Sequence, residues 1–277
     1  MSLLRCPDCR GTLSAVVACT SCGRAFRRDD GLPRLRTLAD DATAEQEYSQ
    51  IYARDADPWA YEKRAVEVLK ADRVCEVVAS LVSNGAVVVE AGCATGHITR
   101  RLARLPIELV VFDLIPPAVQ VAQQLVSDAK ANARIEWCSA SATRLPVARG
   151  ASDLVLLLDG PLSWHLSPAA LDAVLEEACA AVKPGGHVLI MDYLTPRRFG
   201  ELRDPVRRSR LDIVAEHALP DRVSYVLESM VKALRGWSFI RWAIGSMALA
   251  RFFARISAWF GEKGSKHLLL VCRPRSR

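Results

Sequence analysis

The sequence has no apolar run long enough to cross a membrane. A spanning helix needs about 20 consecutive apolar residues, and the 277-residue chain has no such stretch, although 51% of its residues are hydrophobic. Cysteine, aspartate and arginine interrupt residues 1–25, which excludes the apolar segment of a secretory signal peptide. We therefore expect a cytoplasmic protein with enough apolar residues for one large core and a small second domain.

Acidic residues are scarce at both ends of the chain. Residues 1–36 contain seven basic and three acidic residues, and residues 197–277 contain seventeen and seven. The middle, residues 37–196, reverses this balance with thirteen basic and twenty-one acidic residues. Basic ends favour an anionic partner, namely a nucleic acid, an acidic membrane surface or a phosphate-bearing substrate. The alternative is that these arginines are solvated on helix faces.

Four of the nine cysteines form two close pairs, Cys6-Pro-Asp-Cys9 and Cys19-Thr-Ser-Cys22. Each CxxC turn points two thiolates at one place, and two such turns complete a tetrahedral zinc site. A zinc held by four thiolates has no open position for chemistry, so we expect this zinc to be structural. The other cysteines are isolated and are expected to be small buried hydrophobes: Cys75, Cys93, Cys138, Cys179 and Cys272.

A strand, a loop of small residues and a helix follow one another from residue 87. Three valines lead into Glu90, small residues occupy 91–96, and a helical pattern starts at His97. Such a loop lets backbone N–H groups approach a ligand closely. A second apolar strand, residues 109–112, ends in Asp113, where an acid can accept hydrogen bonds from a ribose diol. The pattern predicts a nucleoside-type cofactor at the carboxyl edge of a parallel sheet.

The loop departs from the dinucleotide fingerprint G-x-G-x-x-G. It carries an acid, Glu90, ahead of Gly92 and Gly96, with Ala94 between them. A carboxylate there would repel a pyrophosphate and suits a cationic amino-acid cofactor better. The spacing resembles motif I of the class I S-adenosylmethionine-dependent methyltransferases, E/D-x-G-x-G-x-G, with alanine replacing the middle glycine.

Further segments resemble the same family in order and spacing. Residues 135–146 resemble its adenine-side segment, with Ser141 where the family usually has aspartate. Residues 152–159 resemble its fourth strand, and residues 175–192 its next helix, "LKPGG" turn and fifth strand. The resemblance implies S-adenosylmethionine as the cofactor. It also implies these cofactor-binding residues: Glu90, Gly92, Cys93, Ala94, Gly96, Asp113, Leu114, Ser141, Ala142, Thr143 and Asp159.

The amino-terminal segment resembles a small zinc ribbon. Beyond Cys22, residues 23–33 match the end of its pattern, "CPxCxGxL…CxxCGxxFxxxDGxP". That module acts as an activating partner of RNA and protein methyltransferases. It is also fused ahead of bacterial methyltransferase domains, including a 23S rRNA guanine methyltransferase. The resemblance implies a structural or substrate-presenting role.

The segment between the ribbon and the core, residues 38–72, begins as a polar linker and continues with helical spacing. Residues 57–62 resemble the "DPWxYE" entrance of several small-molecule methyltransferases, where a helix covers the cofactor. The resemblance adds Tyr52, Trp59 and Tyr61 as cofactor-binding residues, because a sulfonium is attracted to aromatic ring faces. The alternative is that they are ordinary core aromatics.

Methyl transfer is an in-line displacement in which the protein aligns the acceptor, excludes water and in some cases removes a proton. Asp159 and His165, at the tip of the strand before them, are the candidate catalytic residues. Either is expected to act as a base or to orient the acceptor, and histidine titrates in the suitable range. A surface histidine at a helix start is the alternative for His165. Asp192 and Tyr193 are weaker candidates.

Residues 197–264 replace a short closing unit with a longer insert. Residues 230–260 are rich in aromatic residues and alanine, and Arg241, Arg251 and Arg255 fall on one side of a helical wheel. This profile favours an interfacial membrane helix or a lid over an apolar substrate, and the alternative is a helical hairpin packed on the core. Arginines cluster at the start of the insert: Arg197, Arg198, Arg203, Arg207, Arg208 and Arg210.

We predict an α/β fold with a doubly wound, mostly parallel seven-stranded sheet, a preceding four-cysteine zinc ribbon and a C-terminal helical insert. The predicted units are a zinc ribbon at 1–37, a linker and cofactor-roof helix at 38–72, a cofactor-binding core at 73–196, the insert at 197–264, and a final strand and tail at 265–277.

Three functions stay open at this point. The leading hypothesis is S-adenosylmethionine-dependent methyl transfer to a small-molecule or lipid-like acceptor in specialised metabolism, with peripheral membrane contact if the insert is interfacial. The alternative is an rRNA or tRNA base methyltransferase, which the zinc ribbon and the basic ends favour, although the chain has no N-P-P-Y-like motif. The third is a catalytically silent zinc-ribbon partner protein, which Ala94 and Ser141 leave open.

Overall fold

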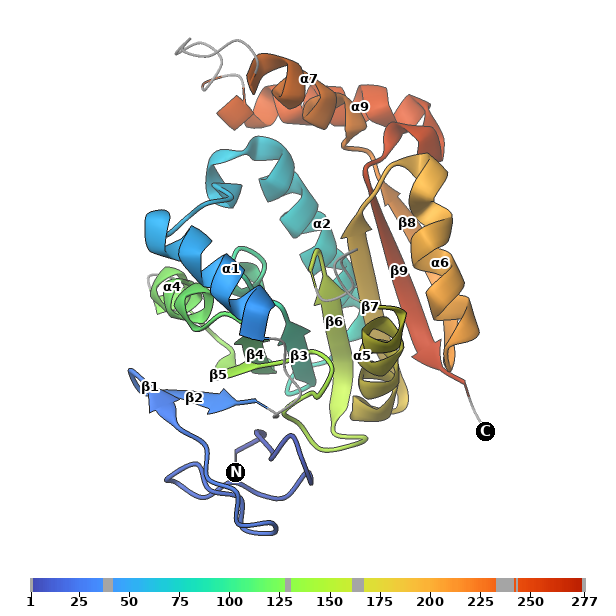
Figure 1. Cartoon of the computed structure of the whole chain (residues 1–277). Coiled ribbons are helices and arrows are strands. Elements are labelled where there is room, and N and C mark those ends of the chain that lie inside the picture. Colours follow the sequence, from blue (N-terminus) through green and yellow to red (C-terminus); the bar gives the residue numbers. More distant parts are fainter. Residues whose placement is uncertain are drawn as a thin grey trace.

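The computed structural model describes residues 2–36, 42–127, 131–160, 167–232, 242 and 244–275. These residues form one nine-stranded sheet with helices on both faces (Figure 1). The strand order is β1-β2-β5-β4-β3-β6-β7-β9-β8. The strands from β5 to β7 run parallel, so their carboxyl ends meet at one edge of the sheet.

The parallel strands are apolar and mostly buried. They are β3 (Val87–Ala91), β4 (Glu108–Asp113), β5 (Arg134–Ala140), β6 (Ser152–Leu158) and β7 (Val182–Tyr193). Runs such as the three valines of β3 place apolar side chains on both faces of the sheet, because helices cover both faces. The strands predicted before Glu90, Asp113 and Asp159 are confirmed, and each delivers its acid to the same edge.

Helices cover the two faces of the sheet. On one face, Val74, Leu102 and Val119 pack with side chains of β3 and β4. On the other face, Leu175 and Phe199 join the buried cluster. The helices are α1 (Ala42–Arg54), η1 (Tyr61–Lys63), α2 (Ala65–Leu81), α3 (Thr99–Leu102), α4 (Pro116–Ser127), α5 (Pro168–Ala181), η2 (Pro196–Arg198) and α6 (Phe199–Arg208).

The chain closes the sheet with an antiparallel pair and a helical insert. β9 (His267–Pro274) pairs with both β7 and β8 (Leu211–Leu219), which confirms the predicted final strand. Between β8 and β9 lie α7 (Arg222–Lys232), α9 (Met247–Trp259) and η3 (Gly261–Gly264). The helical insert is thus present, although residues 211–219 within its predicted range form a strand.

The amino-terminal segment extends the sheet. β1 (Arg28–Asp29) pairs with β2 (Leu32–Leu35), and β2 runs parallel to β5, with Leu35 opposite Ala140. The prediction of a seven-stranded sheet is therefore wrong in number. β5 would otherwise be an edge strand with unpaired backbone groups, and the ribbon supplies a strand that pairs with it. Figure 1 shows the ribbon at one end of the molecule and α7 and α9 at the other.

Candidate functional site

A cavity of about 650 Å³ lies at the carboxyl edge of the parallel strands. Its walls include the loops after β3, β4, β5 and β6, the end of β7, and side chains of α1, α2 and α7. Sites for small molecules in open α/β sheets lie at this edge, and their volumes are typically about 300–1,000 Å³. None of the lining residues belongs to the described ribbon, so the ribbon does not form part of this cavity.

The loop after β3 brings backbone to the cavity wall. Gly92, Ala94 and Gly96 all have positive φ angles, of 76°, 46° and 81°. Ala94 therefore adopts the left-handed conformation of the glycine it replaces, at a cost of roughly 1–2 kcal/mol. Gly96 has no room for a side chain, because a Cβ there would lie 2.7 Å from the Cβ of Ala122 on α4. Gly92 and Ala94 line the cavity.

Asp113 ends β4 and lines the cavity beside this loop. Its Oδ2 accepts a hydrogen bond from the Ala94 backbone N–H at 2.9 Å, and its Oδ1 accepts one from the Ile115 N–H at 2.9 Å. Burial raises its pKa, while these backbone donors oppose the rise. A carboxylate oxygen has more than one acceptor direction, so both oxygens can still accept from a ligand diol.

Small residues continue the wall on the far side of Asp113. Leu114, Ala142 and Thr143 line the cavity, as predicted for the adenine side. Ser141 lines it too, with its hydroxyl 2.8 Å from that of Thr143, and it accepts from the Thr143 backbone N–H. The structure therefore brings these predicted residues together with Asp113.

An aromatic roof covers the cavity from α1 and η1. Tyr52, Trp59 and Tyr61 all line it, and Tyr52 is buried. His97 holds this roof, because its ring stacks on Tyr61 with centroids 5.1 Å apart and its Nδ1 lies 2.8 Å from the Glu62 carboxylate. Burial would raise the pKa of Glu62, but hydrogen bonds from His97 and Arg101 lower it to about 2. The roof is thus tied to the loop after β3.

Buried charges form the opposite end of the cavity. The Lys70 Nζ, on α2, lies 2.6 Å from the Asp159 Oδ2 and 2.7 Å from the Glu67 Oε2. Burial would lower the pKa of Lys70, but the charges of Asp159 and Glu67 outweigh it and raise the pKa. Burial would raise the pKa of Glu67, but Lys70 and Arg64 lower it to about 2. Lys70 and Glu67 therefore stay charged at neutral pH.

Helix α7 closes this end of the cavity. The Tyr225 hydroxyl donates to the Glu67 Oε1 at 2.7 Å, and Arg64 donates to the Glu228 Oε2 at 2.5 Å. Tyr225, Glu228 and Ser229 line the cavity. The part of the insert that α7 forms therefore lies over the cavity, as a lid would, and one ion pair and one hydrogen bond fasten it to the start of α2.

Asp159, a predicted catalytic residue, has an unusual backbone for a non-glycine residue. Its φ is 50°, and it directly follows β6. Its Oδ1 is buried and accepts no hydrogen bond from the described residues. Left-handed conformations of this kind cost about 1–3 kcal/mol and cluster at functional sites. His165, the other predicted catalytic residue, lies outside the described residues.

Residues 88–186 match the family described as "Methyltransferase domain". The chain carries a class I, S-adenosylmethionine-dependent methyltransferase domain. Its seven core strands in the order β5-β4-β3-β6-β7-β9-β8, the glycine loop after β3 and Asp113 after β4 agree with this assignment. A search of the curated proteins returns no match.

Solved structures share the fold of this methyltransferase domain at low sequence identity. The N-methyltransferase NodS from Bradyrhizobium japonicum WM9 aligns with a TM-score of 0.57 and 18% identity, over 84% of this chain and 98% of its own. The [4+2]-cyclase SpnF aligns with 0.52 and 18%, over 74% and 82%. Geranyl diphosphate C-methyltransferase from Streptomyces coelicolor A3(2) aligns with 0.51 and 14%, over 76% of each chain. At these identities the likeness concerns the fold alone.

Several residues around the cavity escaped the sequence analysis. Lys70 and Glu67 are polar residues on the otherwise apolar buried face of α2, which was the available signal. His267 is a polar residue at the start of an apolar strand, and it is 1% exposed. Asp192, named as a weaker candidate, lines the cavity, and burial raises its pKa to about 6. Asp221 gave no signal, because its partner is distant in sequence.

Three residues predicted to bind the cofactor do not line the cavity: Glu90, Cys93 and Gly96. Glu90 is 3% exposed, and its Oε2 has no hydrogen-bond partner among the described residues. Burial, helped by the nearby charge of Asp113, raises the pKa of Glu90 to about 8. Direct contact between Glu90 and a cofactor stays a prediction. In the cofactor-free protein, Glu90 is a buried and mostly protonated acid.

Glu90→Gln is expected to stabilise the cofactor-free protein at neutral pH. Because the folded-state pKa lies above the ordinary value of 4.5, the folded protein holds a proton that the unfolded chain releases. The contribution of this proton to the free energy of unfolding is therefore complete below pH 4.5 and is lost as the pH rises toward 8. The free energy of unfolding is lower by about 3 kcal/mol at pH 7. Glutamine removes this dependence. Thermal unfolding should show a higher unfolding temperature for Glu90→Gln at pH 7 and no difference near pH 4. Glu76→Gln, at an exposed position, is the control. An effect that does not depend on pH would contradict the raised pKa of Glu90.

The four predicted metal ligands come together. The Sγ atoms of Cys6, Cys9, Cys19 and Cys22 lie within 4.8 Å of one another. The Sγ atoms of Cys6 and Cys22 are 3.8 Å apart, which matches the spacing of about 3.8 Å that tetrahedral Zn–S bonds of 2.3 Å require. Backbone N–H groups of Ser21 and Cys22 point at the Cys19 Sγ. The donor set and spacing fit a structural zinc.

Some of the arginines at the basic ends are paired with carboxylates. In the arginine cluster at the start of the insert, Arg198 pairs with Glu201, and Arg203 pairs with both Glu216 and Glu262. In the ribbon, Arg10 pairs with Glu177. These pairs reduce the positive surface that a nucleic acid would need.

The insert exposes several aromatic side chains. Phe252 and Trp259 on α9 are 55% and 84% exposed, and Arg251 and Arg255 share that exposed side. Arg241 lies outside the described residues. Among the described residues, no helix is long and apolar enough to span a bilayer. The contact of this insert with a membrane surface stays a prediction.

Proposed function

We propose that this protein transfers a methyl group from S-adenosylmethionine to a small-molecule acceptor bound in the cavity. The observation that carries the proposal is one continuous cavity, which reaches from Gly92 and Asp113 to the buried charges at Lys70 and Asp159. The first end suits a nucleoside and the second suits a reacting polar group. Side chains of α1 and α7 form part of the cavity walls and so reduce the access of water to both ends.

The chain's own residues fit the cofactor. Asp113 keeps acceptor directions for a ribose diol, and the backbone at Gly92 and Ala94 leaves room for close approach. The aromatic side chains of Tyr52 and Tyr61 line the cavity and would supply negative potential to a cationic sulfur bound there. When bound, S-adenosylmethionine supplies an electrophilic methyl carbon, and the residues around it orient the acceptor toward that carbon.

The charges of the cavity support an acceptor without a phosphate group. The two described lining cations at the acceptor end, Arg64 and Lys70, are already paired with Glu67, Glu228 and Asp159. An anionic group at this end would meet no unpaired cation among the described lining residues. A neutral or amine-bearing small molecule agrees with this wall better than a phosphate-bearing acceptor does.

Labelled methyl transfer tests the proposal. Titration calorimetry is expected to give micromolar binding of S-adenosylmethionine. With radiolabelled cofactor and a source-cell extract separated into RNA, lipid and small-molecule fractions, the label is expected in small molecules. Label in RNA would contradict a small-molecule acceptor and would favour the ribbon as an RNA-binding surface. Absence of cofactor binding would refute the proposed function as a whole.

A further inference from the structure

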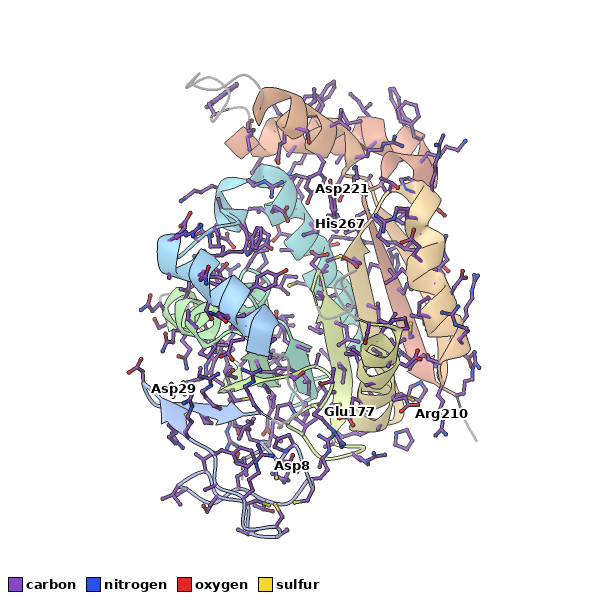
Figure 2. The ribbon with its side chains drawn as sticks, viewed as in Figure 1. Asp8, Asp29, Glu177, Arg210, Asp221 and His267 are labelled. Atoms are coloured by element: carbon purple, nitrogen blue, oxygen red, sulfur yellow. The ribbon has the colours of Figure 1, made fainter. Side chains whose placement is uncertain are left out.

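His267 and Asp221 form a buried pair at the edge of the cavity. His267 is the first residue of β9, and Asp221 precedes α7, so the pair lies where the insert leaves the sheet (Figure 2). The His267 Nδ1 lies 2.5 Å from the Asp221 Oδ2, and the other carboxylate oxygen accepts from the Lys266 backbone N–H at 2.6 Å. His267 is 1% exposed, yet it lines the cavity.

The groups around His267 favour one of its two nitrogens as the site of the proton. Its Nε2 lies 3.4 Å from the Lys70 Nζ and 3.6 Å from the Asp159 Oδ1. Lys70 is an ammonium group, because Asp159 and Glu67 raise its pKa, and an ammonium group can only donate. This contact favours an accepting Nε2 and a proton on Nδ1, where the Asp221 carboxylate can accept it. The ring presents a lone pair at Nε2.

Two tyrosines hold the imidazole plane. The rings of Tyr193 and Tyr225 lie 5.2 Å and 5.4 Å from that of His267, centroid to centroid. Both tyrosines line the cavity, as does Asp159. The titratable and charged groups facing His267 are thus Lys70 from α2, Asp159 after β6, Asp192 and Tyr193 from β7, and Tyr225 and Asp221 from the insert. An imidazole oriented by a carboxylate, with its second nitrogen at a cavity, has the geometry of a general base.

We propose that His267 accepts the proton that the acceptor loses during methyl transfer, and that Asp221 is the positioning residue for its ring. This inference rests on the proposed function. It assigns the acceptor to molecules whose attacking nitrogen or oxygen carries a proton. The nearby carboxylate of Asp159, with its unpartnered Oδ1, stabilises the imidazolium on the side opposite Asp221.

The step balances as follows. A lone pair on the acceptor nitrogen or oxygen forms the bond to the methyl carbon, and the electron pair of the breaking carbon–sulfur bond stays on sulfur. The proton leaves the acceptor for the His267 Nε2. The imidazolium is then flanked by Asp221 and Asp159, and it later releases the proton to water.

His267→Asn separates a structural role from a catalytic one. Asparagine can still donate an N–H to Asp221, but it has no nitrogen at the Nε2 position. We expect its transfer rate to the acceptor fraction of the extract to fall at least 100-fold at pH 7, with binding of S-adenosylmethionine within twofold of wild type. The rate should recover at alkaline pH, where the acceptor loses its proton to solvent. His187→Asn, in a buried histidine outside the cavity lining, is the matched control.

Nitrogen-15 spectra of the free protein test the tautomer without any turnover. We expect His267 to show a downfield Nδ1–H proton that disappears in His267→Asn. Asp221→Asn can place an amide N–H against Nδ1, so the proton should move to Nε2 and the rate should fall with it. A wild-type ring protonated at Nε2, or full activity in His267→Asn, would overturn the inference. Failure of the protein to bind S-adenosylmethionine would instead refute the proposed function beneath it.

The chemical class of the acceptor gives an independent test. Labelled product should be either a base, which enters aqueous acid on extraction, or the ether or ester of a hydroxyl or carboxyl group. Either result agrees with an acceptor that loses a proton. A label found on sulfur of a thioether, which has no proton to lose, would contradict the role of His267.

Discussion

Replacing both Cys6 and Cys9 with serine is expected to release the zinc and to unfold the ribbon. Structural zinc in small modules contributes about 10–16 kcal/mol of apparent binding free energy, which is also folding free energy. In the part of the ribbon that holds the cysteines, isolated bridges join the turns, so we expect the metal to supply much of the stability there. Metal analysis should give about one zinc per wild-type chain and none in the variant.

Unfolding of the ribbon should also weaken the edge of the sheet on which it packs. The ribbon packs Leu4 and Phe26 into the same buried cluster as Leu145 and Val147, and β2 pairs with β5. Hydrogen exchange should therefore become fast in residues 2–36 and rise at the edge of β5, while β3 and β6 stay protected. Cys179→Ser, in an isolated half-buried cysteine, is the control. A variant that is metal-free and keeps a protected ribbon would refute the zinc assignment.

Asp113→Ala is expected to weaken binding of S-adenosylmethionine by at least 100-fold. Hydrogen bonds to a charged acceptor are worth about 1.5–3 kcal/mol each, and a ribose diol can donate two of them. The substitution also frees the backbone N–H groups of Ala94 and Ile115, which hold the loop in place. Both effects act on affinity, which titration calorimetry measures.

The control for this substitution is Asp172→Ala, an exposed acid on α5. Circular dichroism and thermal unfolding should show that Asp113→Ala remains folded, because the carboxylate lies at the end of β4 and lines the cavity rather than the apolar core. Unchanged affinity in a folded variant would mean that the cofactor does not lie against β4. The cavity assignment would then have to be abandoned.

Local sequence patterns predicted much of the fold and of the candidate site. The strand–loop–helix around Glu90 and the second strand ending in Asp113 were readable because residues next to one another determine a strand, a turn and a helix start. Parallel strands place their carboxyl ends at one edge, so Asp113, Ser141 and Asp159 could be predicted to meet without knowledge of their contacts. The four-cysteine metal site could be predicted for the same reason, since each CxxC turn involves neighbouring residues.

The nine-stranded sheet could not be predicted from the same patterns. β1 is two residues long and β2 is four, and neither has the length of an ordinary strand. Their pairing with β5 depends on how the ribbon docks on the core, through contacts such as the hydrogen bond from the Arg5 N–H to the Pro146 carbonyl at 2.8 Å. Such contacts connect residues more than a hundred positions apart.

The sequence by itself determined the cofactor end of this protein, because glycines, a strand-end acid and cysteine pairs act over short spacings. Only the tertiary structure decided the acceptor end. Lys70, Asp159 and His267 come from a helix, a strand end and the last strand, and they meet only when α7 and β9 close on the core. Burial then strengthens the interactions between them, since water no longer screens them.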